Sequence, residues 1–197
     1  MVFIPAGEFI MGTNKVDKEE THKKIGAVKP LYLDQHPERK LFLDSYYIDQ
    51  YEVTNEEYSR FLNANQFTDI PAHWEDGVFP EGHEYHPVTQ VTWWEAWSYC
   101  QWSDKQLPTE AQWEKASRGP DGLPFPWGKE FIKGKANVGI EGDRKTMPVL
   151  SYPEDSSPYN VKGLSGNVME WTLNWYMPYP GNKRKEFRFG KVFKVLR

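Results

Sequence analysis

The chain has 197 residues, of which 39% are apolar and 26% are charged, a composition typical of globular proteins and not of disordered or fibrous ones. Its 24 basic and 28 acidic residues leave a net charge of −4, so we expect no nucleic acid partner, and no apolar run is long enough for direct insertion into a membrane. The single cysteine, Cys100, excludes an intrachain disulfide and a cysteine-based zinc site.

The N-terminal part of the chain favours short strands. Residues 1–12 alternate apolar and small residues around a Pro-Gly turn, which predicts a hairpin of two strands. Residues 13–40 carry many charges and few apolar side chains, so we expect a solvated excursion there. Residues 41–53 are rich in Leu, Tyr, Phe, Ile and Val, and predict one or two strands in the core.

Three helices are predicted next, because a Thr is followed three residues later by Glu or Gln at each of three positions. This spacing is typical of a capping box, in which the two residues satisfy each other's free backbone N–H groups. The pairs are Thr54 with Glu57, Thr92 with Glu95, and Thr109 with Gln112. The side chains expected to face inward are Tyr58, Phe61 and Leu62 in the first helix, Trp93, Ala96, Trp97 and Cys100 in the second, and Trp113 and Ala116 in the third.

From residue 120 onward the helical period is lost in clusters of Gly, Pro, Asn and Asp, and only residues 191–197 again alternate as in a strand. Long irregular segments in a compact domain are usually held by disulfides, metal ions or buried aromatic side chains. Since a disulfide is excluded, aromatic residues and a hard cation remain. The oxygen-rich segments 137–143 and 163–170 are the places where such a cation is expected.

Three other groups of side chains have both a functional and a structural interpretation. Glu110 and Glu114, one helical turn apart, are available for acid–base chemistry, but a solvated helix face or a first-turn acid explains them better. His83 and His86 have a metal-chelating spacing within a Gly- and Pro-flanked loop, and a surface loop is the preferred interpretation. Cys100 lies on an apolar helix stripe and is interpreted as a buried, unreactive thiol.

The segment 163–171 is the most regular of the late loops. Its glycine-rich turn can present backbone carbonyls, and Glu170 adds a carboxylate, which together suit Ca²⁺. A tight turn that leads into a strand explains the same residues. The residues alone leave both interpretations open.

Six segments of the chain form a recognisable set, in this order: VFIPAGEFIMG (2–12), FLDSYYIDQYEVTN (42–55), HPVTQVTW (86–93), LPTEAQWE (107–114), PWG (126–128) and GNVMEW (166–171). Together they resemble the formylglycine-generating (sulfatase-modifying factor) family. The resemblance implies an α+β, C-type-lectin-like fold with little regular secondary structure, about three helices packed on short antiparallel strands, and long loops. It spans nearly the whole chain, so residues 1–197 are expected to form a single domain that lacks the C-terminal segment of the family.

The resemblance also implies two structural calcium sites. At the first, the Asn137 side chain and the Val138 carbonyl would be ligands, with Asp143 as the next carboxylate. At the second, the ligands would be carbonyls of Gly163, Gly166 and Val168 and the carboxylate of Glu170. Gly163 stands where many members of the family have Asp or Asn, so the second site would lack one side-chain ligand.

Enzymes of this family use a pair of cysteines, which bind copper(I), to convert a substrate cysteine to formylglycine with oxygen. The pair belongs to the C-terminal segment, and Cys100 is not one of the two, so copper is expected only if a continuation supplies them. A second enzymatic branch, the iron-dependent sulfoxide synthases, takes its histidine ligands from an additional helical domain.

We therefore expect a non-catalytic binding or structural unit, an accessory subunit that joins a protein partner or a larger assembly. The alternative is a formylglycine-generating oxidase completed by a C-terminal continuation. No targeting segment is visible, and the resemblance to accessory proteins of envelope assemblies favours an extracytoplasmic location.

Overall fold

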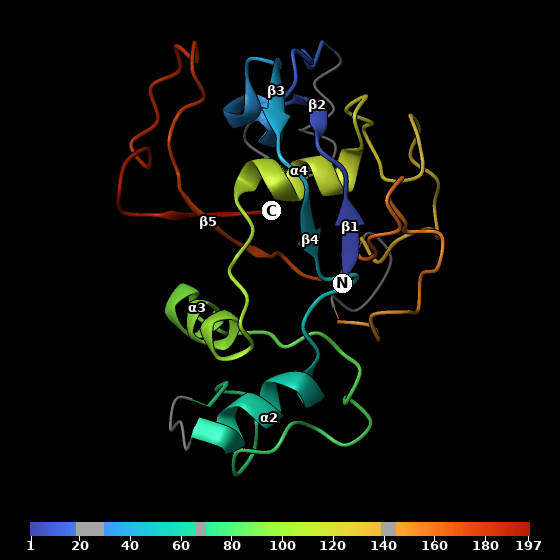
Figure 1. The fold of residues 1–197 in the computed structure, drawn as a ribbon, viewed down its shortest axis with the longest axis vertical. Coiled ribbons are helices and arrows are strands. Elements are labelled where there is room, and N and C mark those ends of the chain that lie inside the picture. The colour runs from blue at the N-terminus through green and yellow to red at the C-terminus, as the bar shows by residue number, and fades with distance from the viewer. Residues whose placement is uncertain (19–29, 66–69, 139–144) are drawn as a thin grey trace.

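The computed structural model describes residues 1–18, 30–65, 70–138 and 145–197 (Figure 1). The strands are β1 (Val2–Ile4), β2 (Gly7–Met11), β3 (Arg39–Leu43), β4 (Tyr46–Ile48), β5 (Trp171–Trp175) and β6 (Lys194–Leu196). The helices are the 3-10 helix η1 (Leu31–Gln35) and the α-helices α2 (Asn55–Asn65), α3 (Trp93–Trp102) and α4 (Glu110–Arg118). The expected α+β architecture, with short antiparallel strands, three α-helices in the described ranges and long loops, is confirmed.

The first two strands do not pair with each other, so the predicted hairpin over residues 1–12 is wrong. β1 pairs with β4 and β2 pairs with β3, and one antiparallel register continues through both ladders, with Ile4 opposite Tyr46 and Gly7 opposite Leu43. Pro5 has no N–H to donate, which explains why the pairing is interrupted there. Residues 2–11 therefore form one long strand with a break, paired with residues 39–48 (Figure 1).

A buried lysine of α4 lies at this break. Lys115 is 1% exposed, and its Nζ donates to the carbonyl oxygens of Pro5 at 2.7 Å and Gly7 at 3.1 Å. Because α4 crosses the paired strands here, the two carbonyls beside the break gain a charged donor (Figure 1). The break in the strands is therefore part of the contact between strand and helix.

All three predicted helix starts are confirmed. At the start of α2, Thr54 Oγ1 accepts from the Glu57 N–H at 3.3 Å, and Glu57 Oε2 accepts from the Thr54 N–H at 2.9 Å. Thr92 and Thr109 begin α3 and α4 with the same reciprocal pair of bonds. Among the described residues, no helix is both long and apolar enough to cross a membrane.

The buried face of helix α3 is shifted from the predicted one, although Cys100 packs against the cluster around Tyr58 as expected. Tyr99 is 6% exposed and packs against Tyr58 and Phe61 of α2, with ring centroids 5.8 and 5.6 Å apart. Trp97, which was expected to face inward, is 36% exposed. Apolar side chains occur on nearly every side of this helix, so their spacing alone could not select the side that faces α2.

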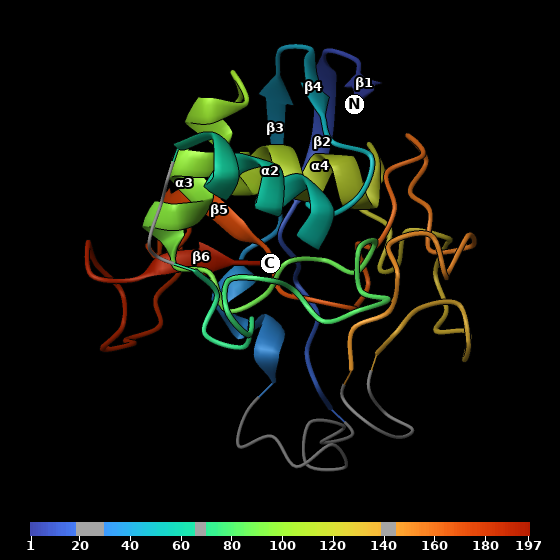
Figure 2. The same ribbon diagram turned by 90° about the horizontal axis from the view of Figure 1, so that it is seen from below.

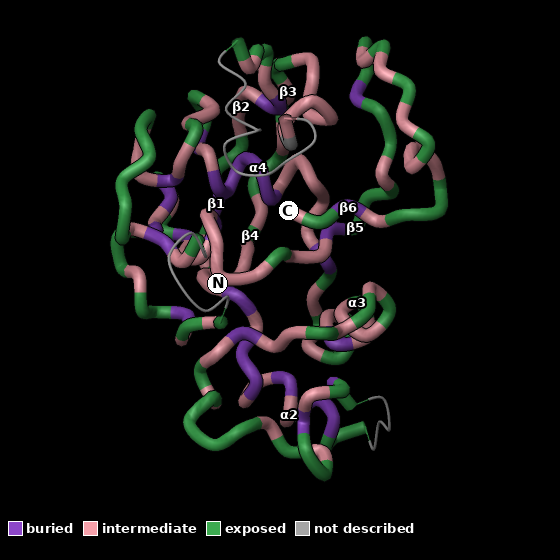
Figure 3. Tube along the Cα trace, turned by 180° about the vertical axis from the view of Figure 1, so that it is seen from behind, coloured by how far each residue is buried: buried purple, intermediate pink, exposed green. Residues whose placement is uncertain are grey.

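Two clusters of buried side chains lie on either side of the connection from β4 to α2. Figures 1 and 2 place α2 and α3 together at one end of the molecule, whereas the described parts of residues 120–170 run along one side. Figure 3 shows that parts of α4 and α2 consist of buried residues. The first cluster contains Ile4, Trp113, Ala116, Val161 and Leu164, and the second contains Tyr58, Phe61, Leu62, Trp74 and Tyr99.

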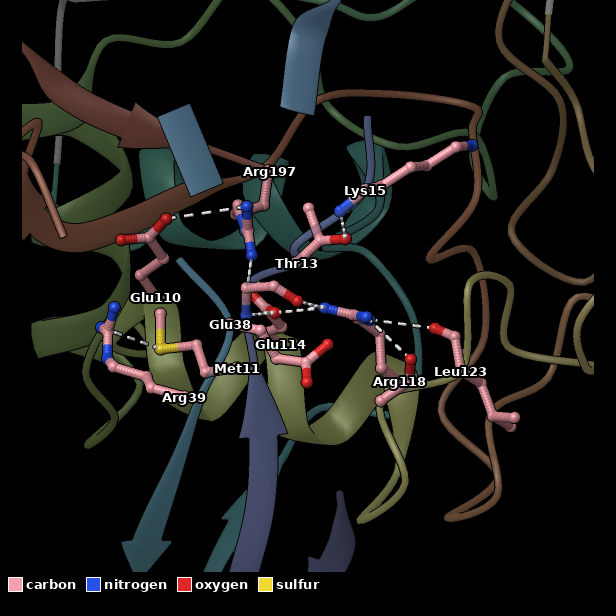
Figure 4. A network of polar contacts seen from close by, with 12 residues as sticks. Met11, Thr13, Lys15, Glu38, Arg39, Glu110, Glu114, Arg118, Leu123 and Arg197 are labelled. Atoms are coloured by element: carbon pink, nitrogen blue, oxygen red, sulfur yellow. Dashed lines mark hydrogen bonds and ion pairs between the residues drawn. The ribbon is translucent and has the colours of Figure 1, made fainter. Parts of the chain in front are cut away.

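Glu114 is fully buried, which corrects the expectation of a solvated helix face. Its Oε1 accepts from the Gly12 N–H at 2.6 Å and from Arg118 at 2.5 Å, and its Oε2 accepts from Arg197 (Figure 4). Glu110 lies 3.6 Å from Arg197 and is also largely shielded from solvent. Both carboxylates therefore belong to a buried network of ion pairs between α4 and the segments around it.

Candidate metal centre

Three carboxylates from separate segments lie within electrostatic reach of one another. Glu52 lies in the connection between β4 and α2, Asp155 lies in the long loop after α4, and Glu170 directly precedes β5. Glu52 and Asp155 are 7% and 2% exposed, and Glu170 is partly buried. This group of three, Glu52, Asp155 and Glu170, is called the carboxylate cluster below.

Burial raises the pKa of all three carboxyl groups, to about 8 for Glu170, about 7 for Glu52 and about 6 for Asp155. The negative charges of Glu52 and Asp155 raise the pKa of Glu170 further, and Asp155 does the same to Glu52. A hydrogen bond from Asn167 partly offsets the shift at Glu52. A cation among these groups would favour their charged forms and relieve their repulsion.

Two oxygen atoms of the carboxylate cluster are buried without a hydrogen-bond partner. Glu52 Oε1 accepts from Asn167 Nδ2 at 3.0 Å, but Glu52 Oε2 is unpartnered. Asp155 Oδ2 accepts from the Ser165 N–H at 3.2 Å, but Asp155 Oδ1 is unpartnered. Buried oxygens of this kind are costly unless a donor or a cation satisfies them, and they mark the place where an ion would fit.

Gly163 lies directly against this cluster. Its φ is +71°, and a Cβ built on it would lie 2.5 Å from Glu52 Oε2. The backbone of the predicted second calcium site and the carboxylate of Glu52 therefore share one small space. Because position 163 has no side chain, that space is open to the carboxylate.

The structure brings the predicted first and second sites together at Gly166. A Cβ on Gly166 would lie 2.2 Å from the Asn137 carbonyl oxygen, which also accepts from the Asn167 N–H at 2.8 Å. The Asn137 side chain donates to the Lys145 carbonyl at 2.9 Å and to Asn167 Oδ1 at 3.1 Å. This contact holds the segment before residue 139 against the glycine-rich turn.

Of the other predicted ligands, only some lie at the glycine-rich turn. Val168 lies on the same turn, where its N–H donates to the Gly166 carbonyl at 2.8 Å, so that carbonyl keeps one lone pair. Val138 is 37% exposed. Asp143 lies outside the described residues, so the first calcium site stays a prediction.

The carboxylate cluster fits a calcium ion better than it fits a transition metal. Within the described ranges, no three His, Cys, Asp or Glu side chains converge closely enough to hold a metal by themselves. Any ion there needs backbone carbonyls as additional ligands, and the glycine-rich turn would have to supply them. Six to eight oxygen ligands in irregular geometry, partly from carbonyls, are what Ca²⁺ prefers.

A cavity of about 560 Å³ borders the site. Glu52 and Glu170 line one part of it, and apolar side chains such as Tyr58, Tyr99 and Leu107 line another. This volume is within the range of small-molecule pockets, roughly 300–1,000 Å³. The carboxylate cluster therefore adjoins a space that is large enough for a ligand or for side chains of a partner.

Sequence reasoning found Glu170 and its turn but missed Glu52 and Asp155. Glu52 lies more than a hundred residues before the turn, and Asp155 lies in the loop that precedes it, outside the 163–170 segment. A signal for Glu52 was present, because it is a lone acid between Tyr51 and Val53 in a segment otherwise suited to the core. Such an acid is usually buried only when it has a partner.

The other candidates do not form a second centre. The rings of His83 and His86 are 4.3 Å apart in a loop, and His86 Nδ1 lies 2.9 Å from Thr146 Oγ1. Burial raises the pKa of the Cys100 thiol to about 11, with a further contribution from Asp49, although Lys105 lowers it in part. A thiol that stays protonated at neutral pH is a poor nucleophile, as expected for Cys100.

The fold and the glycine-rich turn beside buried carboxylates define a domain of the sulfatase-modifying factor class. Residues 1–197 match the sulfatase-modifying factor enzyme 1-like domain family over their full length, and the chain belongs to this family. The crystal structure of CarF is similar in fold, with a TM-score of 0.59 and 20% sequence identity over 91% of this chain and 82% of that one.

Relatives of this chain are named for different functions. The chain is 35% identical to serine/threonine-protein kinase pkn1 of Chlamydia caviae, over 89% of this chain and 28% of the kinase. It is 32% identical to the formylglycine-generating enzyme of Bos taurus, over 89% of this chain and 58% of that enzyme. It is 27% identical to the inactive Cα-formylglycine-generating enzyme 2 of Mus musculus, over 90% of this chain and 70% of that protein. The chain thus spans little more than half of the bovine enzyme and less than a third of the kinase.

Proposed function

We propose that this chain is a calcium-stabilised binding domain that does not itself oxidise cysteine. The observation that carries the proposal is the carboxylate cluster beside the cavity, since two unpartnered buried oxygens there support the binding of a cation. Cys100 is the single thiol of the 197 residues, and its raised pKa keeps it protonated. The murine relative that is named inactive supports a non-catalytic role within this family.

In the proposed calcium site the ligands are the carbonyls of Gly163, Gly166 and Val168 and the carboxylate of Glu170. A bound Ca²⁺ would supply positive charge and would tie the turn to the strand β5 that follows it. The unpartnered buried oxygens nearby support this assignment. The ion has a structural role in this proposal.

The catalytic question is tested directly by assay. The purified chain is incubated with copper(I), oxygen and a cysteine-containing sulfatase peptide, and aldehyde is measured with a hydroxylamine probe and by peptide mass. We expect no aldehyde above the chain-free control, whereas the bovine formylglycine-generating enzyme serves as the positive control. Aldehyde that depends on this chain would overturn the proposal and favour the oxidase alternative.

We also propose a protein partner that occupies the cavity. The apolar walls of the cavity support a contact surface for such a partner. Lys105 and Lys162 also line the cavity, and their amino groups can react with chemical crosslinkers. Crosslinking followed by mass spectrometry of the native assembly should place intermolecular links on these two lysines. Links spread evenly over the surface lysines would contradict a partner at this cavity.

A further inference from the structure

We propose that Glu52 is a direct ligand of the cation at the 163–170 turn and supplies the side-chain oxygen that position 163 lacks. This inference rests on the proposed calcium site and deepens it. It adds a ligand from a segment that is distant from the turn in sequence.

The first step is the position of the Glu52 side chain. The segment that carries it is tied to the turn through its backbone, because the Lys162 N–H donates to the Gln50 carbonyl at 2.7 Å. Asn167 Nδ2 donates to Glu52 Oε1 at 3.0 Å from the turn itself. These two bonds hold the carboxylate against the turn and determine which of its oxygens accepts a hydrogen bond.

The second step is the free oxygen. Glu52 Oε2 is buried and unpartnered, on a side chain that is 7% exposed. It lies 2.5 Å from the place where a Cβ of residue 163 would stand. A carboxylate at this place occupies the space in which a side chain at position 163 would begin, so Glu52 and such a side chain are alternatives.

The third step is the charge. Glu52 and Glu170 line the same cavity, so their two negative charges share one partly buried space. Two carboxylates that remain this close in a buried place are stabilised when a divalent cation bridges them. The carbonyls of the turn complete an all-oxygen set, which suits Ca²⁺ better than Mg²⁺ because Mg²⁺ requires a near-ideal octahedron and keeps several waters.

The experiment is a calcium titration by calorimetry on the wild-type chain and on E52Q, G163D and the double variant E52A/G163D, in which Ala leaves room for the Cβ at position 163. Gln keeps an oxygen for the bond from Asn167 but has no charge, so E52Q should weaken calcium binding about tenfold or more. Asp tolerates positive φ better than most residues, so the double variant should recover most of the affinity. The matched control is D49N, which changes an acid that lines the same cavity and should alter affinity less than about twofold.

The thermal unfolding of the same proteins separates a ligand from a merely structural residue. In chelator, E52Q should melt no lower than the wild type, because repulsion between Glu52 and Glu170 is removed. In calcium, the wild type should gain more than E52Q. A Tm that falls equally with and without calcium would assign Glu52 a structural role only.

The outcomes distinguish the inference from the proposal on which it rests. If the wild type binds calcium and E52Q binds it equally well, Glu52 is not a ligand and the calcium site stands without it. If the wild type binds no calcium, both the site and the role of Glu52 are overturned. If E52Q loses affinity but the double variant does not recover it, Glu52 does not replace a side chain at position 163.

Discussion

Arg197, directly after β6, pairs with the fully buried carboxylate of Glu114 in the centre of α4. The Arg197 side chain is only 8% exposed, and its backbone exchanges two hydrogen bonds with Glu170, of 2.7 and 2.9 Å. The same residue therefore connects the last strand, the central helix and the residue proposed to hold calcium. Its surroundings explain why a charged side chain is found so deep in the domain.

Removal of the Glu114 carboxylate is expected to destabilise the fold strongly. Glu114→Ala leaves Arg118 and Arg197 without their buried partner, a change that typically costs about 3–5 kcal/mol. The control is Glu56→Ala, since Glu56 pairs with Arg60 in an exposed i,i+4 bridge whose loss costs less than about 1 kcal/mol. Urea unfolding of both variants gives the comparison, and similar losses would contradict the importance of the buried network.

The helices could be predicted because their signals are local. A Thr and a Glu or Gln three residues apart meet in any helix that begins at the Thr, whatever the rest of the chain does. Thr54, Thr92 and Thr109 therefore gave the correct starts of α2, α3 and α4. The face that α3 buries depends on its contact with α2, so the local pattern was insufficient for Tyr99 and Trp97.

Neither the strand pairing nor the full candidate site could be predicted from the sequence, and the reason is the same for both. β1 pairs with residues more than forty positions away, and the two-residue gap to β2 resembles a hairpin turn although Pro5 only interrupts a longer strand. Glu170 and Gly163 were found because they share one short segment. Glu52 and Asp155 come from other segments and meet that turn only in the folded chain.

Calcium should raise the thermal stability of the domain, because an ion that binds only the folded state stabilises by mass action. At a hundred times the Kd the gain is about 2.7 kcal/mol, which corresponds to about 5–10 °C in Tm for a chain of this size. Differential scanning calorimetry in calcium and in excess chelator measures the shift. An unchanged Tm, together with no calcium by elemental analysis, would contradict the site.

Glu170→Ala should abolish this calcium-dependent shift, whereas Glu110→Ala should retain it. Glu110→Ala lowers stability in chelator as well, since Glu110 accepts from the Tyr179 hydroxyl at 2.9 Å and lies near Arg197. The difference between calcium and chelator removes this loss from the comparison. Equal calcium-dependent shifts in the two variants would show that Glu170 is not a ligand.

Lys115→Met should destabilise the contact between α4 and the broken strand. Met matches the length of the side chain but cannot donate to the carbonyls of Pro5 and Gly7, and an unsatisfied buried group costs about 1–3 kcal/mol. Lys162→Met is the control, because Lys162 donates to the Pro153 carbonyl at an exposed position. Urea unfolding should show a loss several times larger for Lys115, and comparable losses would indicate that burial of the donor is unimportant.

The Cys100 thiol should react slowly in the native chain and should make stability fall at high pH. Burial raises its pKa from 9.0 to about 11, so the folded state holds its proton more tightly than the unfolded state does. This contribution is fully present below pH 9 and is lost as the pH rises through about 11, because the unfolded chain then gains by releasing the proton first. Cys100→Ala should therefore lose less stability than the wild type between these two pH values, as measured by urea unfolding.

Alkylation of Cys100 by iodoacetamide at pH 8 should be much faster in denaturant than in buffer. Equal rates would show that the thiol is not shielded and that its pKa is not raised.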